Sequence, residues 1–118
     1  MTKKNPKIFL EDILDSIEKI EDYAKNTTEK RFLDNCEKQD AIMKRLEVIG
    51  EAVKNVPKKI KTDNPEIPWK QISGMRDVLI HEYFGVIMER VWDTVRDDIP
   101  KLKNQIRKLL ESFNRTDP

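Results

Sequence analysis

The sequence has few residues of the kinds that disulfides, metal sites and tight hairpins require. Its 118 residues include one cysteine, Cys36, and one histidine, His81. One cysteine cannot form an internal disulfide, and one cysteine with one histidine cannot supply the usual nitrogen and sulfur ligands of a zinc site. Three glycines and six prolines leave few of the special turns that hairpins and barrels demand. The sequence therefore predicts a helical fold with no metal.

Long apolar runs and an excess of charge of one sign are also absent. No stretch approaches the roughly 18 consecutive apolar residues of a membrane span, and Glu11 and Asp12 interrupt the N-terminal segment before a signal peptide can form. The 23 basic and 22 acidic side chains leave a net charge of +1, which argues against a protein that coats nucleic acid through positive charge alone. We expect one domain over residues 1–118, in a reducing cytoplasm, with no membrane partner.

Apolar residues recur at steps of three and four along most of the chain, which is typical of amphipathic helices. This pattern predicts helices over residues 8–25, 29–55, 68–83 and 88–113, with a proline-rich loop over residues 56–68. Each helix has one apolar stripe to bury, and none is apolar all round. The expected fold class is therefore all-α, an up-and-down four-helix bundle.

Individual residues predict local features of these helices. Pro100 removes a backbone donor, so the last helix is expected to kink near residues 97–100. Gly50 on an apolar stripe indicates a close contact between helices, and Gly74 favours a break in the third helix. Three other residues lie on apolar stripes and are expected to be buried, the tryptophans in the core or in a dimer contact: Cys36, Trp69 and Trp92.

One short run of the third helix carries most of the groups that could perform chemistry. Arg76, Asp77, His81 and Tyr83 lie within eight residues. An imidazole can exchange a proton with a ribose 2′-hydroxyl or with the leaving oxygen, and a guanidinium can bind the phosphate between them. These groups suit RNA cleavage without a metal. We therefore take Arg76 and His81 as candidate catalytic residues and Asp77 as a supporting residue.

The helix geometry limits which of these groups act together in one copy of the chain. At about 100° per residue, Arg76 and His81 lie about 140° apart on an ideal helix, whereas Arg76 and Tyr83 lie only about 20° apart. The reaction is also best served by both a base and an acid, and the chain has one histidine. A homodimer that brings two copies of His81 and Arg76 into one cleft satisfies both conditions. The helix over residues 29–55, about 40 Å long, would overhang a minimal bundle, so that part of it, or of the last helix, faces the second copy.

Residues 76–83, Arg-Asp-Val-Leu-Ile-His-Glu-Tyr, resemble the Arg-x4-His-x-Tyr signature of HepT-like proteins, a branch of the HEPN superfamily of small helical ribonucleases. Further segments carry the same resemblance: residues 47–52, residues 68–72 leading into Gly74, residues 91–92, and residues 98–100. The resemblance implies an HEPN-like fold and a homodimeric, metal-independent endoribonuclease toxin of a type VII-like toxin–antitoxin pair, without a cofactor. Arg76 and His81 take the catalytic positions of the family.

The resemblance also implies a protein partner and a modification. In such pairs a minimal nucleotidyltransferase, the MntA-like antitoxin, transfers AMP from ATP onto the tyrosine of the signature, here Tyr83. An AMP group at Tyr83 would place a negative phosphate beside Arg76, where it would compete with the phosphate of RNA. Many family members have asparagine after the signature arginine, whereas this chain has Asp77, which adds a negative charge near the phosphate site.

Other interpretations of the same residues remain open. The chain is alternatively a non-catalytic, nucleotide-binding helical dimer that acts as an accessory subunit of the nucleotidyltransferase, or a bundle that docks a partner helix. Arg76 and His81 would then belong to an ordinary helix, with a surface ion pair to Asp77 or Glu82. Arg45, Glu47 and Glu51 are expected on a solvated or interfacial face. Lysine clusters either bind phosphates or serve solubility, and they include these residues: Lys54, Lys58, Lys59, Lys61, Lys101, Lys103 and Lys108.

Overall fold

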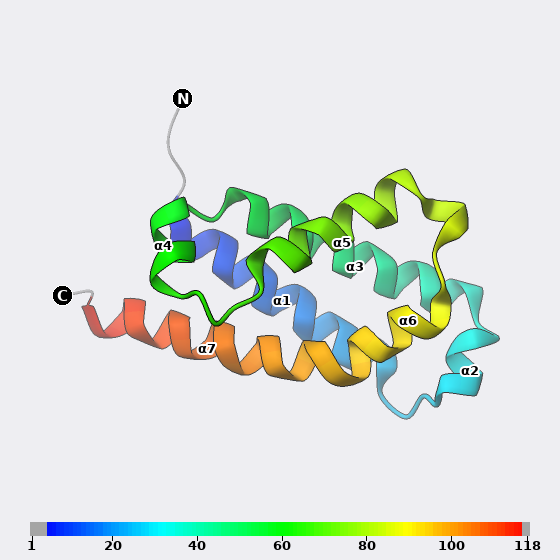
Figure 1. Cartoon of the computed structure of the whole chain (residues 1–118). Helices are drawn as coiled ribbons and strands as arrows, with labels where there is room; N and C mark the ends of the chain where they lie inside the picture. The colour runs from blue at the N-terminus through cyan, green and yellow to red at the C-terminus, as the bar shows by residue number, and fades with distance from the viewer. Residues whose placement is uncertain (1–4, 117–118) are drawn as a thin grey trace.

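The computed structural model describes residues 5–116, apart from the side chains of residues 83 and 114–116. Within that part of the chain every regular element is a helix (Figure 1), which confirms the all-α prediction. The elements are α1 (Pro6–Ala24), α2 (Glu29–Leu33), α3 (Cys36–Asn55), α4 (Lys58–Asp63), α5 (Trp69–His81), the 3₁₀ turn η1 (Tyr83–Gly85), α6 (Met88–Asp93), the π-helical turn η2 (Thr94–Asp98) and α7 (Ile99–Thr116).

The four long helices bury their apolar stripes against one another. α1 packs along α3, α5 packs on α3, and α7 packs on α1, so that α5 and α7 form opposite borders of the face in Figure 1. The fully buried side chains of the core include Ile13 and Ile17 of α1, Ile42 and Ile49 of α3, and Ile106 of α7. Burial of each such side chain contributes about 1.5–3 kcal/mol. This packing fixes α5, the helix that carries the candidate catalytic residues.

The prediction of one long helix over residues 29–55 was wrong. The chain forms α2 and then α3, with a break at Asp34 and Asn35. The Asn35 Oδ1 accepts a hydrogen bond from the Lys38 backbone N–H (2.9 Å), which starts a new helix. Because Cys36 is the first residue of α3 and not a mid-helix residue, it is exposed, and the expectation that it is buried was also wrong. Among residues 5–116 no 40 Å helix overhangs the bundle, since α3 has 20 residues and is about 30 Å long.

Three smaller expectations about helix boundaries also need correction. The short helix α4 occupies part of the predicted loop over residues 56–68. α5 runs without a break through Gly74, and it ends at His81 instead of Tyr83.

Both tryptophans lie in the core as predicted, and the ring of Trp92 stacks at a tilt against Phe32, with the ring centroids 5.2 Å apart.

The sequence predicted a kink near residues 97–100, and the structure has the π-helical turn η2 at residues 94–98, which begins before the predicted position. The Ile99 backbone N–H donates to the Thr94 carbonyl, a bond across five residues that defines the π-helical turn η2. Pro100 has no N–H, and its ring crowds the carbonyl four residues before it. The wider turn just before Pro100 accommodates the proline while the helix continues into α7.

Candidate active site

The position of α5 on α3 is set by a contact at Gly50. A Cβ atom built on Gly50 would overlap the Cβ of Arg76 and would lie 3.2 Å from the Ile72 carbonyl oxygen. No side chain fits there unless α5 moves away from α3. The predicted close helix contact is therefore confirmed, and it falls directly under the candidate catalytic Arg76.

Two carboxylates hold the Arg76 guanidinium. Nε lies 2.9 Å from Glu51 Oε2, and Nη1 donates to Asp77 Oδ1 at 3.1 Å. The buried Nε–H makes no hydrogen bond among the described residues, so its contact with Glu51 is an ion pair without hydrogen-bond geometry. The Arg76 side chain is 24% exposed. It therefore lies at the edge of the core, partly buried and partly exposed to solvent.

Lys54 extends this cluster from α3. Its Nζ donates to the same Asp77 Oδ1 at 2.6 Å. Glu51, Arg76, Asp77 and Lys54 thus form a chain of alternating charges, here called the charge network. The hydrogen bond from Lys54, and to a smaller degree that from Arg76, keeps the pKa of Asp77 below its ordinary value. Asp77 is accordingly a carboxylate at neutral pH.

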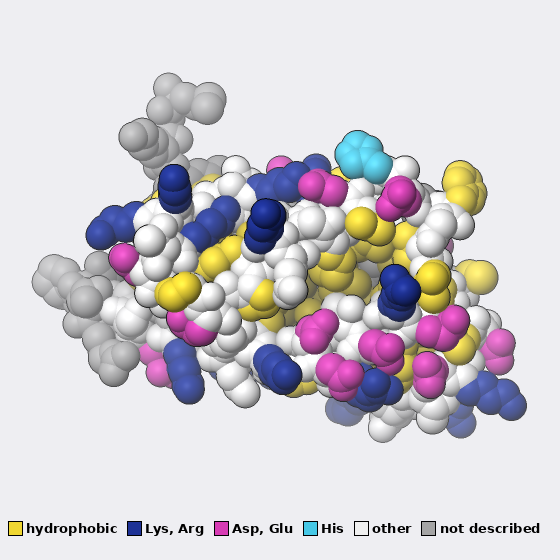
Figure 2. Space-filling model, viewed as in Figure 1, with side chains coloured by type: hydrophobic (Ala, Val, Ile, Leu, Met, Phe, Trp, Pro, Cys, Tyr) yellow, Lys and Arg dark blue, Asp and Glu magenta, His cyan; other side chains and the backbone are white. Residues whose placement is uncertain are grey.

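His81 lies apart from the charge network. It is the last residue of α5 and it is exposed, and Figure 2 shows it in cyan at the edge of the molecule. No hydrogen bond or ion pair between described residues joins His81 to Arg76. Arg76 faces α3 while His81 faces solvent, which agrees with the 140° separation expected on an ideal helix. One copy of the chain brings Arg76 and Asp77 together but leaves the imidazole outside that cluster.

Tyr83 follows the end of α5. Its backbone belongs to the 3₁₀ turn η1, so the ideal-helix angle of 20° between Arg76 and Tyr83 no longer applies. The side chain of Tyr83, the predicted site of AMP attachment, lies outside the described part of the structure.

Apolar side chains are exposed on both sides of His81 in the sequence. Val78 is 46% exposed and Phe84 is 100% exposed, and Ile80 and Ile87 are also exposed. We call these four residues the apolar patch. Figure 2 shows hydrophobic side chains at the surface toward the same end of the molecule as the histidine. A grouping of large apolar side chains of this kind marks an interaction surface more often than single exposed residues do.

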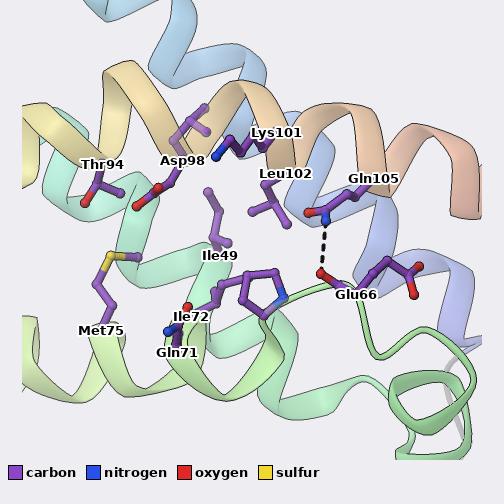
Figure 3. A pocket seen from close by; sticks show the side chains of 12 residues that line it. Ile49, Glu66, Gln71, Ile72, Met75, Thr94, Asp98, Lys101, Leu102 and Gln105 are labelled. Atoms are coloured by element: carbon purple, nitrogen blue, oxygen red, sulfur yellow. Dashed lines mark hydrogen bonds between the residues drawn. The ribbon is translucent and has the colours of Figure 1, made fainter.

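A groove separates α5 from α7 on the face shown in Figure 2, where it appears as a hollow with a hydrophobic floor. Ile49, Ile72 and Leu102 contribute to its floor. On its rim the Gln105 side-chain amide donates to the Glu66 carbonyl oxygen at 3.1 Å (Figure 3). None of the catalytic candidates lines the groove, so it is distinct from the site at Arg76.

The described residues contain no group of three or more histidine, cysteine, aspartate or glutamate side chains arranged to hold a metal ion. None of their helices has the length and apolar character to span a bilayer.

Two of the residues around Arg76 were not predicted to belong to the site. Glu51 was expected on a solvated or interfacial face, and Lys54 was grouped with solvated or phosphate-binding lysines. The signal that points to Lys54 is Gly50, because a glycine that marks a helix contact places the residue four positions later on the same face of its helix. Glu51 lies about 100° around the helix from Gly50 and reaches Arg76 with its long side chain, which the spacing alone does not predict.

Comparisons with known proteins point in one direction. The family model described as "Ribonuclease HepT-like" matches residues 13–109. A protein of Methanocaldococcus jannaschii named "Gamma-glutamylcyclotransferase and putative RNase" is 46% identical over 113 residues, and the aligned region covers 96% of this chain and 51% of that protein. A protein of Thermococcus cleftensis named "Probable ribonuclease HepT" is 46% identical over 107 residues, covering 91% of this chain and 97% of that protein. No solved structure is significantly similar to the chain.

Proposed function

This chain belongs to the HepT-like ribonuclease family, and we propose that it is a metal-independent endoribonuclease, the toxin of a toxin–antitoxin pair, that cleaves RNA with Arg76 and His81. The observation that carries the proposal is the placement of these two residues on α5. The Cβ of Arg76 lies at the helix contact on Gly50, its guanidinium contacts Glu51 and Asp77, and the imidazole of His81 is exposed to solvent five residues later. The relatives named as ribonucleases support an RNA-cleaving function.

The proposed reaction is an internal transfer within the RNA. His81 takes the proton of a ribose 2′-hydroxyl, the 2′ oxygen attacks the adjacent phosphorus, and the bond from phosphorus to the 5′ oxygen breaks. A second imidazole, protonated, gives its proton to the leaving 5′ oxygen. Arg76 binds the phosphate and stabilises the negative charge that develops on its oxygens. The products are a 2′,3′-cyclic phosphate and a 5′-hydroxyl.

The second imidazole comes from a second copy of the chain in this proposal. The chain contains one histidine, and one copy leaves His81 outside the Arg76 cluster. The apolar patch on either side of His81 provides a surface for a symmetric contact, in which each patch meets its equivalent. A dimer formed through this surface would place two copies of His81 and Arg76 around one cleft.

The first test is the cleavage of RNA in the absence of metal ions. We expect the purified, unmodified protein to cut a labelled single-stranded RNA in excess EDTA and to leave a 2′,3′-cyclic phosphate, because the 2′-hydroxyl is the nucleophile. Gel analysis of the ends, with and without phosphatase treatment, measures this. An RNA with 2′-O-methyl groups throughout is the matched control and should stay intact. A wild-type protein that cuts no RNA would favour the nucleotide-binding accessory subunit instead.

We further propose that a nucleotidyltransferase antitoxin silences the protein by transferring AMP from ATP onto Tyr83. The Tyr83 oxygen attacks the α-phosphorus of ATP, and pyrophosphate leaves. Tyr83 lies two residues after the end of the helix that carries Arg76 and His81. An AMP group there would bring a bulky anion close to an RNA phosphate site.

Mass spectrometry checks the proposed modification. After incubation with an MntA-like enzyme and ATP, we expect a mass increase of one or more AMP groups on a peptide that contains Tyr83, together with loss of RNA cleavage. Tyr83→Phe should keep cleavage activity and take up no AMP. Tyr23→Phe, a change at a tyrosine on α1, is the matched control and should be modified like the wild type. Equal labelling of Tyr83→Phe and wild type would contradict the assignment.

A further inference from the structure

The charge network poses an electrostatic problem for a phosphate-binding arginine. Arg76 contacts two carboxylates, those of Glu51 and Asp77. One guanidinium and two carboxylates carry a formal net charge of −1, so an RNA phosphate that approached them would meet a negative cluster. Lys54 brings the sum of the four groups to zero.

Lys54 also competes with Arg76 for one oxygen atom. Asp77 Oδ1 accepts from Lys54 at 2.6 Å and from Arg76 at 3.1 Å, so the shorter contact is the one to Lys54. A carboxylate beside an unshared guanidinium tends to form a bidentate pair with it, which occupies the donors that a phosphate would use. The lysine therefore limits how much of Arg76 the carboxylate occupies.

We propose that Lys54 is a positioning residue of the site, which holds Asp77 in an ion pair and so keeps the Arg76 guanidinium available for an RNA phosphate. The inference rests on the proposed RNA-cleaving function and adds a residue from a second helix to it. It gives Asp77 a defined place: the carboxylate is tolerated next to Arg76 because Lys54 compensates its charge. The helix contact at Gly50 supports the arrangement, since it fixes the register in which Lys54 reaches Asp77.

A double-mutant cycle on binding and cleavage tests the inference. The probes are a labelled 2′-O-methyl RNA for affinity and a labelled unmodified RNA for kcat/KM, both at low ionic strength, where screening is weakest. Lys54→Met is expected to weaken binding and to lower kcat/KM about fivefold, the upper range for an exposed charge pair. In an Asp77→Asn background, the same change should alter either quantity by less than about twofold. Asp77→Asn alone should bind RNA at least as tightly as the wild type.

Two control variants distinguish a positioning role of Lys54 from a general loss of positive charge, and a measurement of thermal unfolding distinguishes it from loss of the fold. Lys54→Arg keeps the ion pair with Asp77 and should restore wild-type values. Lys19→Met removes one positive charge from a similarly exposed ion pair, that of Lys19 with Asp15 on α1 (3.1 Å), and should leave RNA binding and cleavage near wild type. Thermal unfolding of each variant, followed by circular dichroism, reports whether it is folded.

The outcomes distinguish this inference from the proposed function. If the wild type neither binds nor cuts RNA, the proposed function and the inference fail together. Suppose that the wild type binds RNA and that Lys54→Met lowers affinity and kcat/KM by the same factor in the wild-type and in the Asp77→Asn background. Lys54 then contacts RNA directly or has no role in the site. The positioning inference is then overturned, and the ribonuclease proposal stands.

Discussion

Replacing His81 with alanine is expected to slow RNA cleavage by about a thousandfold, the middle of the range that a positioned general acid or base contributes. The variant should fold like the wild type, because the His81 side chain is exposed at the end of α5 and fills no part of the core. Initial rates on a labelled RNA measure the loss, and the thermal unfolding temperature should not change. Gln71→Ala, a change of another exposed residue of α5, is the matched control and should cleave at the wild-type rate.

Mixed dimers extend this prediction to the proposed shared cleft. Arg76→Ala is expected to be as inactive as His81→Ala, since it removes the phosphate ligand. Co-expression of the two inactive chains produces dimers with one intact Arg76 and one intact His81. These dimers keep one of the two imidazoles that the proposed reaction uses, so if one cleft uses both copies they should cleave faster than either inactive homodimer but well below the wild-type rate. A His81→Ala protein that cleaves as fast as the wild type would contradict the catalytic assignment.

Replacing Gly50 with valine is expected to lower the free energy of unfolding by about 3 kcal/mol, at the upper end of the cost of overpacking a core. A Cβ at this position overlaps Arg76, whose own Cβ is fixed to the backbone of α5, so the two helices must separate. This loss is a large fraction of the roughly 5–15 kcal/mol that stabilises a typical domain. Urea unfolding monitored by circular dichroism measures it. Cleavage should fall as well, because Arg76 moves with α5.

The second glycine inside a long helix provides the control. Gly74 on α5 has no heavy atom within 4 Å of a built Cβ. Gly74→Ala should therefore raise the free energy of unfolding by as much as about 1 kcal/mol, because alanine favours the helix more than glycine does. If Gly50→Val were as stable as the wild type, the close contact between α3 and α5 would not exist in solution.

The helical fold could be predicted from the sequence because each long helix has its own apolar stripe. The break before α3 was missed for the same reason. Phe32, Cys36 and Gln39 continue the spacing of an amphipathic helix across the break, although Cys36 is exposed. Asn35 indicated the start of a new helix, because its side chain caps a helix N-terminus. The prediction followed the continuous apolar stripe instead, which favours one long helix.

The candidate site was predicted only in part because its residues come from two helices. Arg76, Asp77 and His81 share one helix, so local spacing was sufficient to find them and to place Arg76 and His81 on different sides. Glu51 and Lys54 reach the site only through the pairing of α3 with α5. That pairing depends on tertiary packing, which a local pattern does not contain.

The π-helical turn at residues 94–98 gives the chain a place where its length can change without turning α7. Its five-residue hydrogen bond accommodates one residue more than an α-helical turn does. Because the wide turn takes up that residue, deleting it would restore an α-helical turn and leave α7 on the same face. A deletion at the start of α7 would instead rotate everything after it by about 100° and shift it by about 1.5 Å. Leu102 and Ile106, which α7 buries against the bundle, would then turn away from the core. Single-residue deletions should therefore be tolerated in η2 and not at the start of α7.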